Sequence, residues 1–201
     1  MTDDALAGGH LYEKVIAAVR GGVTMVQLRE KHSSTAEFVA KALKLKELLR
    51  PYGVPLIIND RIDVALASDA DGVHIGQSDM PIGIARKLLG PEKIIGLSVE
   101  SLQDVLSANE TDADYIGVSP VFSTPTKTDT AAPFGLEGLK LAVEKSVHPA
   151  VAIGGINLSN AGSVMACGCD GIAVVSAVLC APDPCRASAE LLKIIRNDRG
   201  I

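Results

Sequence analysis

The sequence of 201 residues has no tryptophan and only three tyrosines and three phenylalanines. Proteins that bind single-stranded nucleic acid stack the bases on aromatic side chains and carry a surplus of basic residues for the phosphates. Here 19 lysines and arginines stand against 24 aspartates and glutamates, which gives a formal net charge of −5 at pH 7. The composition therefore argues against nucleic acid as a partner.

Long apolar runs are also absent, because no run reaches the roughly 20 residues that a membrane-spanning helix needs. The first ten residues, MTDDALAGGH, lack the basic and then apolar pattern of a secretory signal. We therefore expect no membrane partner and a cytoplasmic location. The sequence leaves a homo-oligomer open, since it shows no evident apolar stripe that would decide self-association.

Cysteine is scarce, with four residues at positions 167, 169, 180 and 185. They show neither paired C-x-x-C spacing nor the neighbouring histidines of a zinc site. We expect free thiols, either buried or at the surface.

The sequence does contain a series of short apolar runs that are rich in Val and Ile. Each run has the length and composition of a strand buried on both faces. Stretches with helical spacing separate the runs; over 36–49, for example, the apolar residues fall on one side and most charged residues on another. The predicted strands are Val23–Leu28, Pro55–Ile58, Gly72–Ile75, Ile94–Leu97, Tyr115–Val118, Ala150–Ile153 and Gly171–Val175.

Repeated strand and helix units demand parallel strands with right-handed crossovers. Polar residues follow these strands, and a glycine stands just before the strands that begin near residues 23, 72 and 171, where a helix ends and the chain turns inward. We predict a single α/β domain over residues 1–201. Its fold is a (β/α)8 TIM-type barrel rather than an open doubly wound sheet.

The beginning of the chain fits this barrel least well. Only MTDDALAGGH precedes the helix predicted at about Leu11 to Arg20, and its two aspartates and two glycines make a poor strand. The length is also short for eight complete units. We therefore expect the first strand to be short, irregular or missing.

Two cations and an amide stand at the end of the first clear strand, in T-M-V-Q-L-R-E-K. The two-residue period of a strand puts Gln27, Arg29 and Lys31 on one face, which in a barrel is the interior. Two cations inside a mostly apolar barrel are costly without an anion to neutralise them, which indicates a bound polyphosphate. The alternative is a pair of internal salt bridges to acidic residues.

Two carboxylates follow the next two strands. Asn59 and Asp60 end the first of these in L-I-I-N-D-R, and Asp79 follows the second in G-V-H-I-G-Q-S-D. Neighbouring parallel strands bring these loops together, and two carboxylates suit Mg²⁺ that also binds phosphate oxygens. Alternatively, Asp60 pairs with Arg61 or caps a helix near Ile62, and Asp79 caps a helix near Pro81.

Hydroxyl groups dominate the next strand ends. Ser98 ends I-I-G-L-S, and a long loop in Y-I-G-V-S-P-V-F-S-T-P-T-K carries Thr124, Thr126 and Lys127. Such a loop provides hydroxyl donors, one cation and the mobility of a lid, although an ordinary solvated loop is the alternative. We interpret His74, within a strand, as a structural hydrogen-bonding residue rather than a catalyst.

Small residues end the last two strands, in A-I-G-G-I-N at 152–157 and A-V-V-S-A at 173–177. They let backbone N–H groups approach a phosphate, at the place where barrels often bind one. The pairing predicts a monophosphate site, although Gly154 and Gly155 would also suit a simple turn.

Seven features occur in the order and spacing of the thiamine-phosphate synthase family: QLREK, NDR, GVHIGQSD, the strand-end Ser98, GVSPVFSTPTK, AIGGI and VVSA. The chain resembles this family from about Gly21 to Ala177. Endings like AIGGI occur in many phosphate-binding barrels, so the combination carries the resemblance. Similar proteins have an apolar first strand that leads into a T-D pair, which here is Thr2-Asp3.

The resemblance implies a transferase that joins 4-amino-2-methyl-5-hydroxymethylpyrimidine diphosphate to hydroxyethylthiazole phosphate, giving thiamine phosphate and pyrophosphate. It implies one Mg²⁺ per active site, held by Asp60 and Asp79. Catalysis would fall to Arg29, Lys31, Ser98 and Lys127. The pyrimidine diphosphate would bind to Gln27, Arg29, Lys31, Asn59, Ser98 and Lys127, and the thiazole phosphate to Thr124, Pro125, Thr126, Gly155, Val175 and Ser176.

Two other functions compete with this hypothesis. A thiazole-phosphate tautomerase is a related barrel that keeps a monophosphate site but needs no magnesium and pyrophosphate site. The set of Gln27, Arg29, Lys31, Asp60 and Asp79 argues against it. A non-catalytic barrel that senses a thiamine precursor would be distinguished by its failure to release pyrophosphate.

Overall fold

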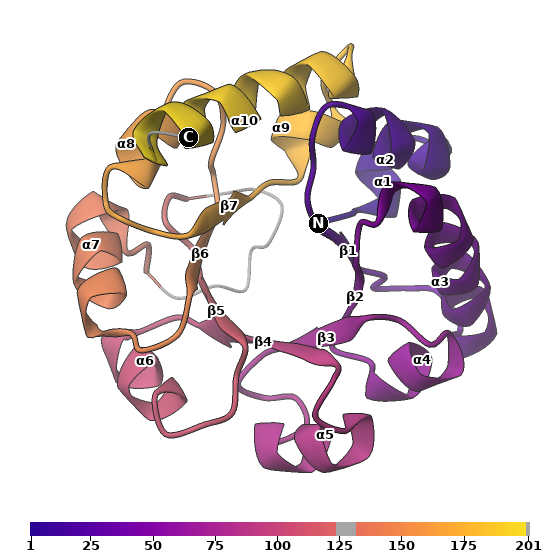
Figure 1. Ribbon diagram of the computed structural model, residues 1–201, viewed down its shortest axis with the longest axis horizontal. Helices are drawn as coiled ribbons and strands as arrows, with labels where there is room; N and C mark the ends of the chain where they lie inside the picture. Colours follow the sequence, from indigo (N-terminus) through magenta and orange to yellow (C-terminus); the bar gives the residue numbers. More distant parts are fainter. Residues whose placement is uncertain (124–131, 200–201) are drawn as a thin grey trace.

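The computed structural model describes residues 1–123 and 132–199. Within them, seven parallel strands form one sheet in which each strand lies beside its neighbours in the sequence. Figure 1 shows the strands curving into a ring with the helices outside it. The strands are β1 (Val26–Leu28), β2 (Leu56–Asn59), β3 (Gly72–Ile75), β4 (Ile94–Val99), β5 (Tyr115–Val118), β6 (Ala150–Ile153) and β7 (Gly171–Ala173).

The helices surround this ring and cover its outer face (Figure 1). The one predicted over 36–49 is α3, and Ser34 and Glu37 form a capping box at its start. The helices are α1 (Asp4–Ala7), α2 (Leu11–Arg20), α3 (Thr35–Leu49), the 3-10 turn η1 (Arg50–Tyr52), α4 (Ile62–Ala67), α5 (Ile82–Leu89), α6 (Leu102–Ala108), α7 (Gly135–Lys145), α8 (Ala161–Met165), α9 (Ser176–Leu179) and α10 (Pro184–Arg199).

The apolar runs form strands because both faces of the sheet are covered. Leu56, Ile57 and Ile58 of β2 are all fully buried, as the continuous apolar pattern predicts. The predicted first and last strands are longer than the observed ones. Residues 23–25 lie outside β1, because β1 pairs with β2 only from Val26 onward, and the chain turns into α9 two residues after β7.

The gap between β7 and β1 is bridged by the first residues of the chain. The Met1 amino group donates to the Val174 carbonyl oxygen at 3.1 Å. The Thr2 N–H donates to the Gln27 carbonyl at 2.8 Å, and the Thr2 hydroxyl accepts from the Arg29 N–H at 3.0 Å. Thr2 is 2% exposed. An extended segment without regular strand pairing thus joins the two edges, as expected for an irregular first strand.

Two glycines bring α2 and α10 together outside this gap. A Cβ at Gly21 would overlap the Cys185 carbonyl oxygen at the start of α10, and one at Gly22 would overlap the Leu192 side chain. Gly22 also has a φ of +101°, which only glycine adopts readily. The glycine pair therefore ends α2 and also admits α10 to the helical layer.

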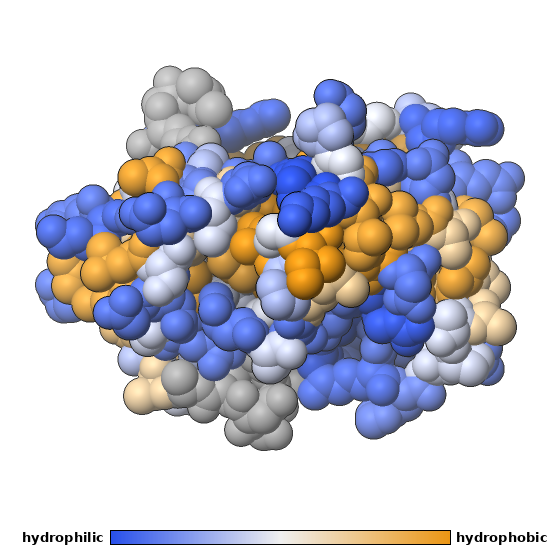
Figure 2. Space-filling model, turned by 90° about the horizontal axis from the view of Figure 1, so that it is seen from below, coloured by the Kyte–Doolittle hydropathy of each residue, from blue (hydrophilic) through white to orange (hydrophobic). Residues whose placement is uncertain are grey.

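The outer surface mixes hydrophilic and apolar groups, as Figure 2 shows for one side of the molecule. Leu43, Ile84 and Leu88 on the outer helices are half exposed. Such scattered apolar side chains are usual on soluble surfaces and identify no partner. Within residues 1–123 and 132–199, no helix is both long and apolar enough to span a membrane.

Candidate active site

The polar residues predicted from the sequence gather at the carboxyl ends of the strands. Asn59, at the end of β2, is in register with His74 of β3, and Ser98 of β4 is in register with Gly117 of β5. Because the strands are parallel and adjacent, their carboxyl ends open toward the same side of the barrel. This is the side on which TIM-type barrels carry their active sites.

The three residues predicted to share a face at the end of β1 have different environments. Gln27 lies within the strand, and its side chain interacts with Tyr115 of β5. Since β1 and β5 are not neighbours in the sheet, this contact crosses the barrel interior. The Arg29 side chain is 10% exposed and its guanidinium lies 3.6 Å from the Asp3 carboxylate, so one predicted internal ion pair is present. Lys31 is exposed and lies beyond the strand.

Glu30, which the sequence reasoning left out, anchors the segment after β1. Its side chain is 4% exposed and accepts a hydrogen bond from Lys41 of α3 at 2.8 Å. Lys41 also donates to Asp4 of α1 at 2.7 Å, and Ser33 donates to the same Glu30 oxygen. Burial alone would lower the pKa of Lys41, but these two carboxylates raise it. The network fixes the segment that carries Arg29 and Lys31.

Asp60 follows β2 with a φ of +61°, a left-handed backbone that is uncommon for residues other than glycine. Its N–H donates to the His74 carbonyl oxygen at 2.8 Å, which extends the bonding between β2 and β3. Arg61, not Asp60, is the N-cap of α4, so the cap interpretation of Asp60 is wrong. The Arg61 guanidinium binds Asp63 and Thr35.

Asp79 closes the loop after β3 onto itself. One carboxylate oxygen accepts from the Gly76 N–H at 2.7 Å, and the Asp79 N–H donates to the Gly76 carbonyl at 3.2 Å. The N-cap of α5 is Pro81, so the cap interpretation of Asp79 is also wrong. Asp60 and Asp79 therefore follow adjacent strands and serve neither predicted helix as caps.

Metal sites in proteins are built from donor side chains such as His, Cys, Asp and Glu. No group of three or more His, Cys, Asp and Glu side chains lies together as a ligand set in the described part of the chain. The two carboxylates that follow β2 and β3 match the donor chemistry of Mg²⁺, which usually takes only one or two protein carboxylates and completes its shell with water and phosphate oxygens. The four cysteines are free thiols.

The interpretation of His74 as a hydrogen-bonding residue agrees with the structure. Its Nε2 lies 2.8 Å from the Ser98 hydroxyl, and its Nδ1 lies 2.9 Å from the Tyr115 hydroxyl. The sequence reasoning missed Tyr115. The available signal was a tyrosine at the start of an otherwise apolar strand, in a chain with only three. A buried tyrosine hydroxyl usually needs a partner.

The loops after β6 and β7 provide closely approached backbone. Gly154 and Gly155 have φ values of +105° and +67°, and a Cβ on either would lie 2.8 Å from the segment that follows β5. The Asn160 side chain donates to the Gly155 carbonyl at 3.0 Å. Next to this loop, Val175 is the N-cap of α9 and Ser176 is its first residue. The turn role of the glycines is therefore real. The first N–H groups of α9, like those at the start of any helix, have no intrahelical partners.

Thr124, Pro125, Thr126 and Lys127 lie outside the described residues. Their roles stay predictions from the sequence.

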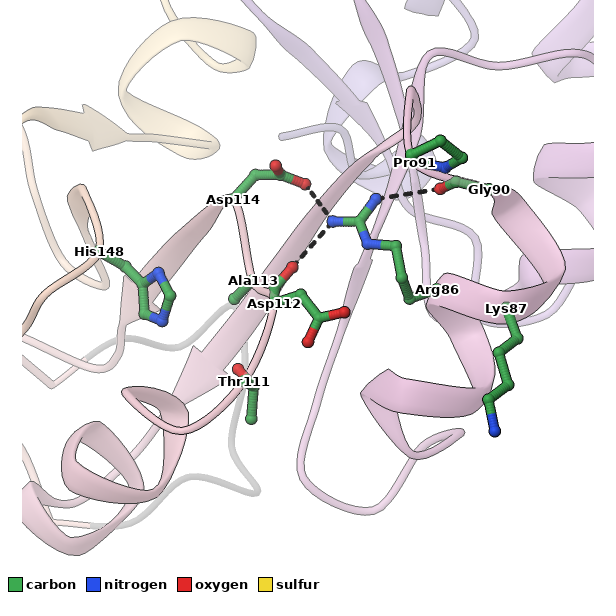
Figure 3. A pocket seen from close by; sticks show the side chains of 9 residues that line it. All are labelled: Arg86, Lys87, Gly90, Pro91, Thr111, Asp112, Ala113, Asp114 and His148. Carbon is green, nitrogen blue, oxygen red and sulfur yellow. Dashed lines mark hydrogen bonds and ion pairs between the residues drawn. The ribbon is translucent and has the colours of Figure 1, made fainter.

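A hollow of about 680 Å³ lies at the opposite end of the barrel, where β4 and β5 begin. Figure 3 shows Arg86 of α5 in its wall, directed toward Asp114 and Gly90. The guanidinium donates to the Asp114 carboxylate at 2.7 Å and to the carbonyl oxygens of Gly90, Lys93 and Asp112. Because these hydrogen bonds occupy donors of the Arg86 guanidinium, we interpret Arg86, in the wall of the hollow, as a structural brace.

Comparison with known proteins identifies the family of this chain. The family model described as thiamine monophosphate synthase matches residues 1–178. The chain is 58% identical over 196 residues to a thiamine-phosphate synthase of Albidiferax ferrireducens, covering 97% of this chain and 90% of that one. It is 52% identical over 196 residues to the enzyme of the same name from Chloroflexus aurantiacus, with the same shares covered.

Solved structures agree with these relatives. The thiamine phosphate pyrophosphorylase of Pyrococcus furiosus superposes with a TM-score of 0.90 at 45% identity, covering 98% of this chain and 94% of that one. An orotidine 5'-phosphate decarboxylase from Pyrococcus horikoshii, at 16% identity and a TM-score of 0.68, shows the shared barrel fold alone. The chain belongs to the thiamine monophosphate synthase family.

Proposed function

We propose that this protein is a magnesium-dependent thiamine-phosphate synthase that joins a pyrimidine alcohol diphosphate to a thiazole phosphate. The observation that carries the proposal is the placement of Gln27, Asn59, Asp60, Asp79 and Ser98 at the carboxyl ends of four adjacent strands. A tautomerase has no need of the carboxylates Asp60 and Asp79, or of the cations Arg29 and Lys31 that follow β1. In this proposal each of these polar residues binds either the pyrimidine diphosphate or the Mg²⁺ that accompanies it.

The pyrimidine diphosphate would occupy the end of the barrel above β1 to β4. The cations Arg29 and Lys31 would neutralise the diphosphate, with Lys127 as a third. The Arg29 guanidinium already lies 3.6 Å from the Asp3 carboxylate, which is a longer distance than in a strong ion pair. A bidentate contact with a phosphate would outcompete this ion pair. Asn59 and Ser98 would donate hydrogen bonds to the same substrate.

Asp60 and Asp79 would hold one Mg²⁺, which supplies positive charge against the departing pyrophosphate. Gly155, Val175 and Ser176 would bind the thiazole monophosphate, mainly through backbone N–H groups at the adjacent ends of β6 and β7. Thr124, Pro125 and Thr126 would complete that site. The two substrates would then lie side by side across the barrel mouth.

The reaction follows from this arrangement of charge. The bond between the pyrimidine methylene carbon and the diphosphate oxygen breaks early, and its electron pair leaves with pyrophosphate. Arg29, Lys31 and Lys127 stabilise that leaving group, and the electron-rich aminopyrimidine delocalises the cation that stays behind. The thiazole nitrogen donates its lone pair to the methylene carbon and forms the new bond. Proximity of the two bound substrates supplies much of the remaining acceleration, and no protein nucleophile is needed.

The direct test is pyrophosphate release from both substrates together, with and without Mg²⁺ and with each substrate omitted. We expect release only with both substrates and the metal, coupled to formation of thiamine phosphate. A folded protein that releases no pyrophosphate would instead be a tautomerase or a sensor. A cytoplasmic location and self-association stay predictions from the sequence.

The assignment of roles is tested by three variants. Asp60→Ala and Lys127→Ala should each depress turnover strongly, because each removes charge from the pyrophosphate site. Cys167→Ser should leave turnover nearly unchanged, since the Cys167 thiol donates to the Leu136 and Ser163 carbonyl oxygens on the outer helices α7 and α8. Equal activity in all three variants would reject these roles.

A further inference from the structure

A partly buried line of polar side chains links four strands beneath the proposed pyrimidine site. His74 of β3 contacts the Ser98 hydroxyl of β4 through Nε2 at 2.8 Å. Its Nδ1 contacts the Tyr115 hydroxyl of β5 at 2.9 Å, and the two rings lie 5.4 Å apart between centroids. Tyr115 in turn interacts with the Gln27 side chain of β1. Both ends of the line, Gln27 and Ser98, are residues that we place against the pyrimidine diphosphate.

Two glycines create the space for this line. A Cβ at Gly96 of β4 would overlap both Tyr115 and His74. A Cβ at Gly117 of β5 would lie 2.9 Å from Cε1 of the His74 ring. Neither glycine has a left-handed backbone in this structure, so what each contributes is the absence of a side chain. The two rings fill the space that a Cβ at either position would take.

The direction of the hydrogen bonds follows from the proton on Tyr115. Burial raises the pKa of Tyr115 far above its usual value, so its hydroxyl keeps its proton at neutral pH. The Gln27 side chain opposes that rise. In the arrangement that we infer, its amide N–H donates to the phenolic oxygen. The phenolic proton is then directed to Nδ1 of His74, because a buried donor without an acceptor is costly.

An imidazole that accepts at Nδ1 carries its proton on Nε2. Nε2 then donates to the Ser98 oxygen, and the Ser98 proton is left to point at a ligand. This direction is the opposite of that in a serine nucleophile, whose histidine accepts the serine proton. The line therefore suits a serine that donates a hydrogen bond rather than one that attacks.

We propose that His74 and Tyr115 are positioning residues that hold the Ser98 hydroxyl as a hydrogen-bond donor to the diphosphate of the pyrimidine substrate. This inference rests on the proposed function for the identity of the substrate. It gives His74, which the sequence alone marks as structural, an indirect part in the reaction through Ser98.

A double-mutant cycle tests whether His74 acts through Ser98. We expect His74→Leu to lower kcat about 10- to 100-fold, the usual range for a residue that orients a functional group. In the Ser98→Ala background the same change should cost less than about twofold, because the group that it orients is gone. His74→Gln offers an acceptor and a donor on one side chain and should recover part of the loss. Losses that multiply in the double variant would overturn the proposal.

Matched substitutions control for general damage. His148→Gln changes a histidine whose Nε2 contacts the Ala108 carbonyl at 2.9 Å at the other end of the barrel, and kcat should stay unchanged. Tyr115→Phe should lower kcat, whereas Tyr52→Phe, which removes a surface bond to Arg20, should not.

Two measurements separate this inference from the proposed function. Calorimetry with inorganic pyrophosphate and Mg²⁺ repeats the cycle without turnover, and the His74 and Ser98 losses in affinity should again fail to add. ¹⁵N NMR of labelled histidine should show His74 with its proton on Nε2, and Tyr115→Phe should increase the other tautomer. If the losses in affinity are non-additive but the protein makes no thiamine phosphate, the proposed function is wrong and the inference stands. If the protein turns over but the His74 and Ser98 losses are additive, or if the His74 proton is on Nδ1, the inference is wrong and the proposed function stands.

Discussion

Asp60 and Asp69 are the residues other than glycine with a positive φ in the part of the chain that the structure describes. A left-handed backbone at such a residue costs of order 1 kcal/mol or more and persists where the surroundings demand it. At Asp60 the demand comes from the strand end, where its N–H bonds to the His74 carbonyl and directs the chain away from the barrel mouth. The strain places a carboxylate beside the proposed phosphate site.

We predict that Asp60→Asn lowers kcat about a hundredfold or more and leaves the protein folded at the assay temperature. Asparagine tolerates the same backbone as aspartate, so the substitution removes the charge at nearly the same side-chain shape. Pyrophosphate release and thermal unfolding measure the two effects. Asp69→Asn is the matched control, because it makes the same change in a similar backbone at the other barrel end. A large loss of kcat in the control, or none in Asp60→Asn, would contradict the magnesium role.

Asp69 also yields a prediction about acid stability. Hydrogen bonds from Lys93 and then Lys46 lower its pKa to about 2. A carboxyl whose pKa is depressed in the folded state stabilises the protein above its unfolded pKa of about 3.9, and this contribution disappears as the pH falls toward 2. The Asp69 side chain is 78% exposed, so we expect less than about 1 kcal/mol. Urea unfolding should show wild type and Asp69→Asn differing near pH 6 and converging near pH 2.

At the scale of elements, the contact between α2 and α10 depends on the absence of a side chain at Gly21. We predict that Gly21→Ala destabilises the protein by about 1 to 3 kcal/mol, because the new methyl group overlaps the Cys185 carbonyl oxygen in α10. Gly83→Ala in α5 is the control, since its Cβ would meet no atom within 4 Å. It should stabilise the helix by up to about 1 kcal/mol. Chemical denaturation of the two variants checks both signs, and equal effects would show that the glycine contact is unimportant.

The strands and helices were largely predictable because their signals are local. A run such as Leu56–Ile58 is apolar throughout because both faces of β2 are covered, and that composition is visible in the sequence. The ends were less predictable. β1 begins three residues later than expected because its partner β2 begins at Leu56, and the position of a partner strand is not encoded within the run itself.

At the scale of the whole molecule, the barrel depends on a join between its first and last parts. Residues 1–3 bond to Val174 after β7 on one side and to β1 and Arg29 on the other. Asp3 also caps α1 by accepting from the Leu6 N–H at 3.1 Å, and it pairs with Arg29. One short segment therefore closes the ring and sets the position of a predicted catalytic cation.

We predict that Thr2→Val destabilises the protein by about 1 to 2 kcal/mol, because it leaves the Arg29 N–H without its hydroxyl acceptor at similar side-chain volume. The KM for the pyrimidine diphosphate should rise, since Arg29, whose N–H loses its acceptor, also carries the guanidinium that we propose as a diphosphate ligand. Denaturation and steady-state kinetics measure the two effects. Thr24→Val, at an exposed position before β1, should change neither value. A raised KM without destabilisation would show that Thr2 acts on the site and not on closure.

The candidate site shows the same division between local and distant information. The strand-end positions of Gln27, Asn59, Ser98 and the two aspartates follow from the parallel order of the strands and could be predicted. The sequence offered helix caps as alternative roles for Asp60 and Asp79, and only the structure showed that Arg61 and Pro81 occupy those caps. Glu30 was missed because its partner Lys41 is on the next helix.

The sequence by itself determined the alternation of strands and helices, the parallel sheet and the end of the barrel that carries the polar residues. These features depend on apolar period and on residues close together in the chain. Only the tertiary structure decided how residues 1–3 close the ring, how Gly21 admits α10 and how His74 joins Ser98 to Tyr115. Each of these contacts joins segments that are far apart in the sequence, so its partners become neighbours only when the barrel has formed.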